Sequence, residues 1–274
     1  MKTLPLVVAA LLLSGVRTPA NPIHVMTFNI RYDNPGDGAN RWSARREAVV
    51  DFLRAQNPDV VGLQEALPGQ LADLQAALPG YQRVGVGRDD GKAKGEHCAI
   101  LVRTSRFAVV ESGTFWLSDT PEVPGSRSWG NSIPRICTWV RLRDSGGKES
   151  HVFNAHLDHQ SQPSRERSAA LLRDRMASVS GPCVLLGDFN ATPDNPAVQV
   201  LLQAGWRDGF AEAAAKDDPG GTFHNWRGGG EGPRIDHVFI RPPARAIRCT
   251  VHRAEVRGRV VSDHHPVSLE LEWE

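Results

Sequence analysis

The chain has 274 residues and a formal net charge of +1 at pH 7, because 32 Lys and Arg are balanced by 31 Asp and Glu. This balance gives no global electrostatic attraction to nucleic acid or to a membrane surface. The length suits one large domain or two small ones. Seven Trp, 26 Gly and 19 Pro favour a loop-rich, strand-rich enzyme over a helical bundle.

The first 20 residues differ in character from the rest of the chain. Lys2 supplies a positive start, Leu4 to Leu13 form a short apolar run, and Ala20 offers a small residue for cleavage. This pattern is typical of a secretory signal peptide and is short for a membrane span. We therefore expect a secreted or periplasmic protein with residues 1–20 removed, one mature domain over residues 21–274, and no integral membrane segment. An uncleaved N-terminal anchor is the alternative.

Export permits disulfides, and four cysteines allow three full pairings. All four lie in or beside apolar, strand-like runs, and none has a C-x-x-C spacing: Cys98, Cys137, Cys183 and Cys249. Cysteine is also among the most buried residue types when it is not paired. The sequence leaves buried thiols and disulfides both open.

Apolar runs separated by Gly, Pro and Ser loops predict two successive series of strands with helices between them. The predicted strands cover residues 23–30, 59–65, 81–86, 97–102, 109–117, 135–142, 149–155, 184–190, 235–240, 246–255 and 267–271. The predicted helices begin at Ser43, Pro68, Pro163 and Asn195 and end near Gln56, Leu78, Val179 and Leu202. The long loop over residues 118–134 is predicted to be exposed and able to form a substrate wall. Two sheets packed face to face, with helices outside, account for this order better than a β/α barrel does.

One apolar strand ends abruptly in Gly187-Asp188-Phe189-Asn190, followed by a proline that cannot extend it. Asp188 and Asn190 point the same way, because side chains alternate along a strand. An Asx-type turn would explain this stretch by itself. Five other strand ends carry the same residue types, however: Asn29, Glu65, His156, Asp236, and Asp263 with His264. Taken together, these strand ends predict an active site.

The residue types fit metal-assisted hydrolysis at phosphorus. Hard oxygen ligands such as Glu65 and Asp263 select Mg²⁺, Mn²⁺ or Ca²⁺ over zinc, and no H-E-x-x-H or three-histidine zinc spacing is present. A metal ion neutralises the charge that grows on phosphate in the transition state. A histidine held by a carboxylate can orient or deprotonate water near neutral pH.

The ordered series of motifs resembles the endonuclease/exonuclease/phosphatase superfamily, which includes deoxyribonuclease I, and within it the compact secreted bacterial members. The motifs are T-F-N-I-R at 27–31, G-L-Q-E at 62–65, N-A-H-L-D-H at 154–159, G-D-F-N at 187–190, R-I-D-H at 234–237 and S-D-H-H-P at 262–266. They run from Val25 to Pro266, essentially the whole mature chain. The resemblance implies a four-layered α/β sandwich, with two central, mostly antiparallel mixed sheets flanked by helices.

The resemblance also implies roles for individual residues. On the metal side, Glu65 would be the main ligand of a Mg²⁺-type ion, with Mn²⁺ or Ca²⁺ as alternatives, and Asn29 and Asp263 would lie close to the ion. The residues implied on the reacting side are His156, Asp188, Asn190, Asp236 and His264, with Glu96, Asp158 and Arg165 in support. His264, held by Asp236, would be the general base or would orient water, and Asp188 would position or activate that water.

Further roles follow from the same resemblance. Asn190 would bind the scissile phosphate. His156 would contact a phosphate oxygen and be paired with Glu96, as in the deoxyribonuclease I branch. Asp158 and Arg165 would form a supporting pair near His156.

The substrate stays open within the class of phosphate esters. Arg31 stands where the repair nucleases carry an acid, which argues against a second metal site, and the chain has no obvious basic insertion for gripping duplex DNA. Nucleic acid is therefore not favoured, although a nuclease remains one alternative. A sphingomyelin or phospholipid phosphodiesterase is another, and a sugar- or inositol-phosphate phosphatase is a third. The phosphatase predicts a narrow basic pocket, to which Arg127, Arg135 and Arg165 would contribute.

Two rivals lie outside this activity. A catalytically silent binding module of the same fold would have lost Glu65, Asp188, Asp236 or His264, and all four are present. A glycosidase with paired carboxylates would leave Asn190 and the pairing of Asp236 with His264 without a purpose. We expect a monomer.

Overall fold

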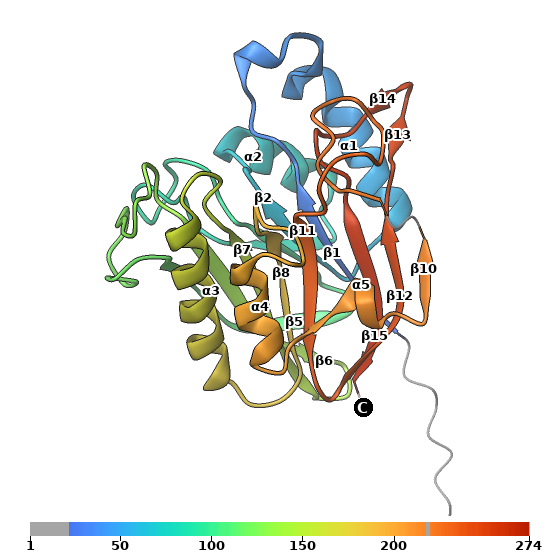
Figure 1. Cartoon of the computed structure of the whole chain (residues 1–274). Helices are drawn as coiled ribbons and strands as arrows, with labels where there is room; N and C mark the ends of the chain where they lie inside the picture. Colours follow the sequence, from blue (N-terminus) through green and yellow to red (C-terminus); the bar gives the residue numbers. More distant parts are fainter. Residues whose placement is uncertain (1–21, 218–219, 274) are drawn as a thin grey trace, which may run out of the picture.

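The computed structural model describes residues 22–217 and 220–273 (Figure 1). The predicted signal peptide lies outside these described residues. Within them, two large β-sheets pack against each other, and helices cover their outer faces. This arrangement confirms the predicted α/β sandwich.

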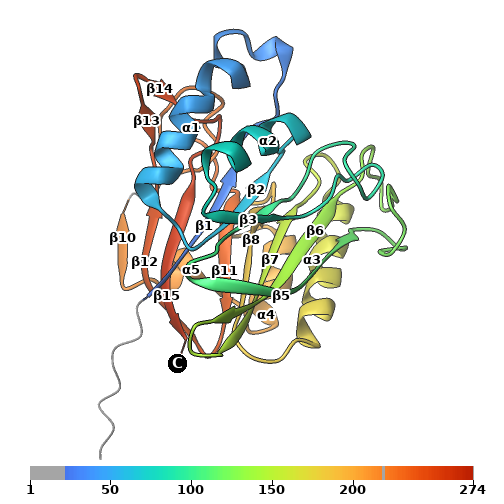
Figure 2. The same ribbon diagram turned by 180° about the vertical axis from the view of Figure 1, so that it is seen from behind.

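The first sheet has seven strands in the order β10-β12-β15-β1-β2-β4-β3. Its strands are β1 (Ile23–Asn29), β2 (Val60–Gln64), β3 (Tyr81–Val84), β4 (Ile100–Arg103), β10 (Ala215–Asp217), β12 (Ala244–Val251) and β15 (Val267–Trp273). The pairs β1–β2 and β10–β12 are parallel, and the other neighbours are antiparallel. Helices α1 (Trp42–Gln56) and α2 (Pro68–Ala77) cover the outer face of this sheet (Figure 2).

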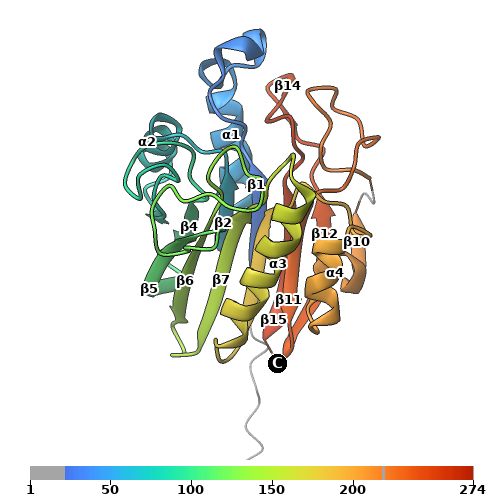
Figure 3. The ribbon, with the colours of Figure 1, turned by 60° about the vertical axis from the view of Figure 1, so that its left-hand side comes forward.

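The second sheet has six strands in the order β5-β6-β7-β8-β11-β9. Its strands are β5 (Phe107–Trp116), β6 (Ile136–Asp144), β7 (Glu149–His156), β8 (Cys183–Asp188), β9 (Arg207–Asp208) and β11 (Asp236–Arg241). Only β7 and β8 are parallel among the pairs of this sheet in the described chain. Helices α3 (Gln162–Ala177) and α4 (Pro196–Gln203) lie over its outer face (Figure 3).

The apolar strands explain why the layers form. The central strands are buried on both faces, so one set of their side chains packs between the sheets and the other packs under the helices. The inner cluster joins Val25 and Val60 of the first sheet to Val152 and Leu186 of the second. The fully buried Asn154 also bridges the sheets, because its Nδ2 donates to the main-chain oxygens of Leu63 and Ala99, both at 2.9 Å.

Local signals set most of the helix ends. Ser161 caps α3 by accepting from the Ser164 amide, and Asn195 caps α4 by accepting from the Ala197 amide. Prolines follow both caps, where their missing N–H costs nothing. Helix α1 does not begin at Ser43, where the sequence pattern predicts its start. That helix begins one residue earlier, at Trp42, after an Arg41 that makes no side-chain cap bond.

The structure also contains short elements that the sequence pattern did not predict. They are the 3-10 helix η1 (Pro35–Asn40), helix α5 (Gly209–Glu212), strands β9 and β10, and the hairpin of β13 (Glu255–Val256) with β14 (Arg259–Val260). Such short strands exist through pairing with a neighbour, which periodicity does not reveal. The predicted strand at 97–102 begins later, at Ile100, because His97 makes only isolated bridges.

All four cysteines are buried and free. The structure therefore decides in favour of buried thiols. Burial raises the pKa of the Cys98 and Cys183 thiols to about 12, so both stay protonated.

Candidate active site

The polar strand ends meet at one edge of the two sheets, the upper edge in Figure 1. Strands β1, β2, β7 and β8 all end there, and β11 and β15 begin there, as their registers require. A hollow of about 490 Å³ opens at this edge. Seven of the predicted site residues line it: Glu65, Glu96, His156, Asp188, Asn190, Asp263 and His264.

Strand register places Asp188 at the centre of the site. It lies directly across from His156 on the parallel strand β7 and from Asp236 on the antiparallel strand β11. Its Oδ1 accepts from the Asn190 amide at 2.9 Å, and its Oδ2 accepts from Asn29 Nδ2 at 2.9 Å. Burial and the neighbouring Asp236 raise the pKa of the Asp188 carboxyl to about 7.

His264 and Asp236 form a buried ion pair beside Asp188. His264 Nδ1 lies 2.9 Å from Asp236 Oδ2, and His264 Nε2 lies 3.8 Å from Asp188 Oδ2. Burial alone would lower the pKa of His264, but the Asp236, Asp188 and Asp263 carboxylates outweigh it and raise the pKa to about 10. His264 is therefore an imidazolium at neutral pH. It is charged where a general base would have to be neutral.

His156 has the opposite character. Burial, with the positive charges of Arg135 and Arg88, places the pKa of His156 well below its ordinary value, so its ring is neutral. Asn190 Nδ2 donates to His156 Nε2 at 3.1 Å and to the Leu157 main-chain oxygen at 3.1 Å. In this arrangement Nε2 accepts and Nδ1 carries the proton.

Two further carboxylates face the hollow from the other sheet. Glu65 Oε1 accepts from Asn29 Nδ2 at 3.0 Å, and its Oε2 accepts from the Tyr32 amide at 3.2 Å. Burial raises the pKa of Asp263 and Glu65 adds to this effect, while His264 opposes it. Two carboxylates that face one hollow are stabilised by a bound cation, and carboxylate oxygens are the ligands that Mg²⁺, Mn²⁺ and Ca²⁺ prefer.

A second set of ligand-type atoms also lies at this edge. Among the described residues, single ligand atoms of Asp188, Asp236 and His264 lie within 4.8 Å of one another. Two of these residues are already bonded to each other, since His264 Nδ1 lies 2.9 Å from Asp236 Oδ2. A protonated imidazole also has no lone pair to offer a metal.

The supporting residues make different contacts from those expected. Glu96 accepts from Arg88 Nη1 at 2.6 Å, and burial raises the pKa of Glu96. No hydrogen bond joins Glu96 to His156 in the described chain, although both line the hollow. Asp158 binds Arg135 Nε at 3.3 Å through its carboxylate. Arg165 Nη1 donates to the Asp158 main-chain oxygen at 2.9 Å, so Asp158 and Arg165 are in contact through the main chain of Asp158 and not through its carboxylate.

Several lining residues were missed or given another role by sequence reasoning. They are Tyr32, Arg88, Ile133, His159, Phe223 and Asn225, together with Arg31, which was noted only as a difference from the repair nucleases. Phe223 and Asn225 belong to the stretch T-F-H-N-W at 222–226, and Ile133 lies near the end of the loop over residues 118–134 that was expected to form a substrate wall. Of the three arginines expected in a basic pocket, Arg135 lines the hollow. Arg127 instead donates to the Ser132 main-chain oxygen in the exposed loop.

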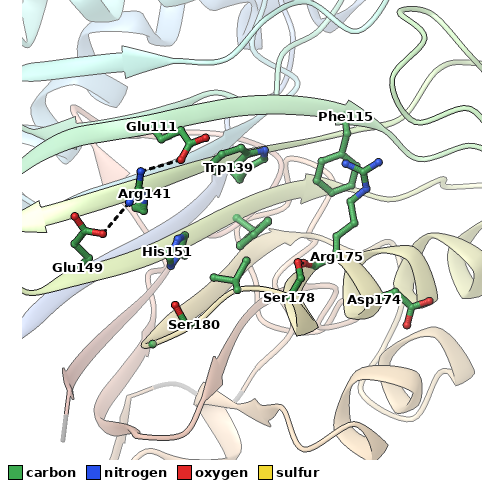
Figure 4. Close-up of a pocket in the computed structure, with 13 residues that line it drawn as sticks. Glu111, Phe115, Trp139, Arg141, Glu149, His151, Asp174, Arg175, Ser178 and Ser180 are labelled. Carbon is green, nitrogen blue, oxygen red and sulfur yellow. Dashed lines mark hydrogen bonds and ion pairs between the residues drawn. The ribbon is translucent and has the colours of Figure 1, made fainter.

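A larger hollow, of about 960 Å³, lies elsewhere on the molecule (Figure 4). It is formed by the outer face of β5, β6 and β7 and by α3, with Trp139 on its floor and the linked Glu111, Arg141 and Glu149 at one side. None of the predicted site residues lines it. The site is therefore identified by its chemistry and not by the size of the cavity.

The fold and this edge define a class of phosphoester hydrolases built on a two-sheet α/β sandwich. The model of the Endonuclease/Exonuclease/phosphatase family matches residues 26–264, and the chain belongs to this family. Its members are phosphoester hydrolases.

Individual relatives agree with this assignment. The chain is similar to the endonuclease/exonuclease/phosphatase of Bacteroides vulgatus, with 36% identity, a TM-score of 0.89 and coverage of 93% of this chain and 100% of that one. The mannosyl-6-phosphatase of Bacteroides thetaiotaomicron gives 36% identity, a TM-score of 0.87 and coverage of 92% and 100%. A protein of Acanthamoeba polyphaga mimivirus is 28% identical over 251 residues, which cover 85% of this chain and 92% of the viral one. Among the described residues, no helix has the length and apolar character needed to cross a membrane.

Proposed function

We propose that this protein is a metal-dependent phosphoesterase in which water attacks phosphorus directly and the alcohol leaves. The observation that carries the proposal is that one hollow brings together the ion-paired His264, the carboxylate of Asp188 and the two acids Glu65 and Asp263. Separate positive and negative groups around one hollow suit a reaction in which charge moves from water to phosphate.

The metal side of the site would be Glu65 and Asp263, with Asn29 holding Glu65 in place. When bound, Mg²⁺, or Mn²⁺ or Ca²⁺ in its stead, would neutralise negative charge on the phosphate. We favour these two acids over the cluster of Asp188, Asp236 and His264, because His264 is protonated and already bonded to Asp236.

The reacting side would be Asp188 with His264. A carboxyl group whose pKa is about 7 can take a proton from water near neutral pH, so Asp188 is the better candidate for the general base. The imidazolium of His264, fixed by Asp236, would stabilise the negative charge that develops on the phosphate. Asn190 and the neutral His156 would form the adjoining wall, where Asn190 Nδ2 would exchange its bond to His156 Nε2 for one to a phosphate oxygen.

We further propose that the substrate is a small phosphate ester, such as a sugar phosphate. Three arginines line the hollow, and each is already fixed by an acid: Arg31 by Asp37, Arg88 by Glu96 and Arg135 by Asp158. Fixed, planar cations in a confined hollow suit phosphate and sugar hydroxyl groups. The similarity to a mannosyl-6-phosphatase over 92% of the chain supports the same substrate class.

The test is hydrolysis of a phosphate-ester panel by purified protein spanning residues 21–274. The panel contains mannose 6-phosphate, inositol phosphates, DNA, RNA and sphingomyelin, each with Mg²⁺, Mn²⁺ or Ca²⁺ and with excess chelator. We expect hydrolysis of a small phosphate ester that chelator abolishes and that His264→Ala eliminates. His151→Ala, at the hollow of Figure 4, is the matched control and should retain activity. Full activity of His264→Ala would rule out the mechanism.

Export also remains a proposal, supported by the N-terminal residue pattern alone. Expression of the full chain in a bacterial host, followed by fractionation and mass spectrometry, tests it. We expect a periplasmic or secreted product that begins near Asn21. A cytoplasmic product that retains Met1 would contradict the signal peptide.

A further inference from the structure

Arg31 is held at the metal side of the hollow by a dedicated set of contacts. Its Nε and Nη2 donate to the two carboxylate oxygens of Asp37, both at 3.0 Å, and its guanidinium lies 4.6 Å from the centre of the Tyr32 ring. Its main-chain oxygen accepts from Arg45 Nη2 at 2.5 Å and from Gln70 Nε2 at 2.9 Å. These contacts hold a residue whose φ of 53° is unusual for a side chain of this size.

Within the described chain, the same contacts leave one nitrogen of the guanidinium, Nη1, without a hydrogen bond. Nη1 faces Glu65 Oε2 at 3.9 Å, while Nε lies 3.8 Å from Asp263 Oδ2. Both distances exceed hydrogen-bond length, whereas the Asp37 contacts do not. Arg31 is therefore anchored by Asp37, forms long ion pairs with the two acids of the metal side, and presents to the hollow N–H donors that make no hydrogen bond to either acid.

Phosphomonoesters and phosphodiesters differ in the negative charge and in the number of terminal oxygens that such donors would bind. A phosphomonoester carries a charge of about −1.5 to −2 near pH 7 and has three terminal oxygens. A phosphodiester carries one negative charge and has two terminal oxygens. A fixed guanidinium next to the metal side supplies both the extra positive charge and the extra donors that the monoester needs.

We propose that Arg31, positioned by Asp37, binds a terminal oxygen of the substrate phosphate and makes the enzyme selective for phosphomonoesters. This inference rests on the proposed phosphoesterase function and adds to it the kind of ester. Arg31 contacts the substrate in this scheme. Asp37 is a positioning residue that acts through Arg31.

A purely structural role for Arg31 predicts a different result. If Arg31 only offset the charges of Glu65 and Asp263, its loss would weaken reactions of monoesters and diesters alike. Selective loss of the monoester reaction therefore separates substrate binding from charge balance within the site.

The experiment compares two esters with the same leaving group, 4-nitrophenyl phosphate and bis(4-nitrophenyl) phosphate, in Mg²⁺. We expect Arg31→Gln to lower kcat/KM for the monoester roughly 10- to 150-fold, the worth of one hydrogen bond between charged groups, and to change the diester rate by less than about fivefold. Asp37→Asn should act in the same direction with a smaller loss, and Arg31→Lys should restore part of the monoester rate. Arg143→Gln, on the exposed part of β6, is the matched control.

A binding measurement separates this inference from the proposed function. Calorimetry should show that Arg31→Gln weakens inorganic phosphate at least about tenfold and leaves dimethyl phosphate and Mn²⁺ binding within about threefold. Equal losses for both esters, or unchanged phosphate binding, would overturn the role of Arg31 even in an active enzyme. An inactive wild-type protein that still shows the Arg31-dependent phosphate binding would instead refute the proposed function alone.

Discussion

Replacing Asp236 with Asn removes the carboxylate that holds His264 charged. The two side chains are buried and joined by a 2.9 Å hydrogen bond. The pKa of His264 is raised from 6.5 to about 10, and at about 1.4 kcal/mol per unit this corresponds to roughly 5 kcal/mol in favour of the imidazolium. Burial acts against the charge, so loss of Asp236 should lower the pKa of His264 by at least about 2 units.

The assay is ¹H–¹⁵N NMR of histidine-labelled, metal-free protein across pH 6 to about 9. In the wild type, the His264 ring should stay protonated through this range. In Asp236→Asn it should become neutral within the range, and kcat should fall roughly 100- to 1,000-fold, because the charge beside the phosphate is lost. The matched control is Asp217→Asn. In the wild type, the Asp217 carboxylate binds Arg248 on the surface at 2.6 Å.

Two results would refute this reasoning. One is a His264 ring that remains charged at pH 9 in Asp236→Asn, which would mean that other groups set its pKa. The other is a neutral ring with kcat within about fivefold of the wild type, which would mean that the imidazolium has no part in the reaction. Far-UV circular dichroism of both variants distinguishes these outcomes from loss of the fold.

Three further predictions concern stability and metal binding. Asn154→Leu should lower the free energy of unfolding in urea by about 2–4 kcal/mol, because two buried main-chain oxygens lose their donor; a loss below about 1 kcal/mol would count against the bridge between sheets. Burial lowers the pKa of His252 to about 4, so between pH 6.5 and 4 this imidazole is protonated in the unfolded chain but not in the folded chain. His252 by itself should therefore lower the stability by up to about 3 kcal/mol as pH drops from 6.5 to 4, and His252→Gln should make the slope in urea unfolding shallower by that amount; an unchanged slope would disprove the assignment. Glu65→Gln should weaken Mn²⁺ binding, measured by calorimetry, at least about tenfold without lowering the melting temperature of the metal-free protein, and unaltered affinity would remove Glu65 from the metal side.

The elements whose signal lies within one short stretch of sequence could be predicted. The apolar run before Asp188 and the prolines that follow Ser161 and Asn195 are local features, and the structure has a buried strand and two capped helices at these places. The set of polar strand ends was predictable for the same reason, because each end is visible as a break in an apolar run. Four of the six lie on parallel neighbours, which bring their ends to one edge.

Partner choice was not predictable in the same way. Glu96 is bonded to Arg88 in preference to His156, and Asp158 takes Arg135 in preference to Arg165. These choices depend on where loops cross the edge, and residues far apart in the sequence compete for one carboxylate. The charge of His264 likewise depends on three acids that come from separate strands and loops.

The sequence by itself determined the strand ends, their residue types and hence the class of chemistry, because apolar periodicity and polar breaks are properties of short segments. Only the tertiary structure decided which acid faces which base. Strand register sets Asp188 opposite both Asp236 and His156, and the loop after β1 turns Arg31 toward Asp263, 232 positions later in the chain. Burial at that edge then fixes the protonation of each group, since the energy of a charge depends on its surroundings in three dimensions.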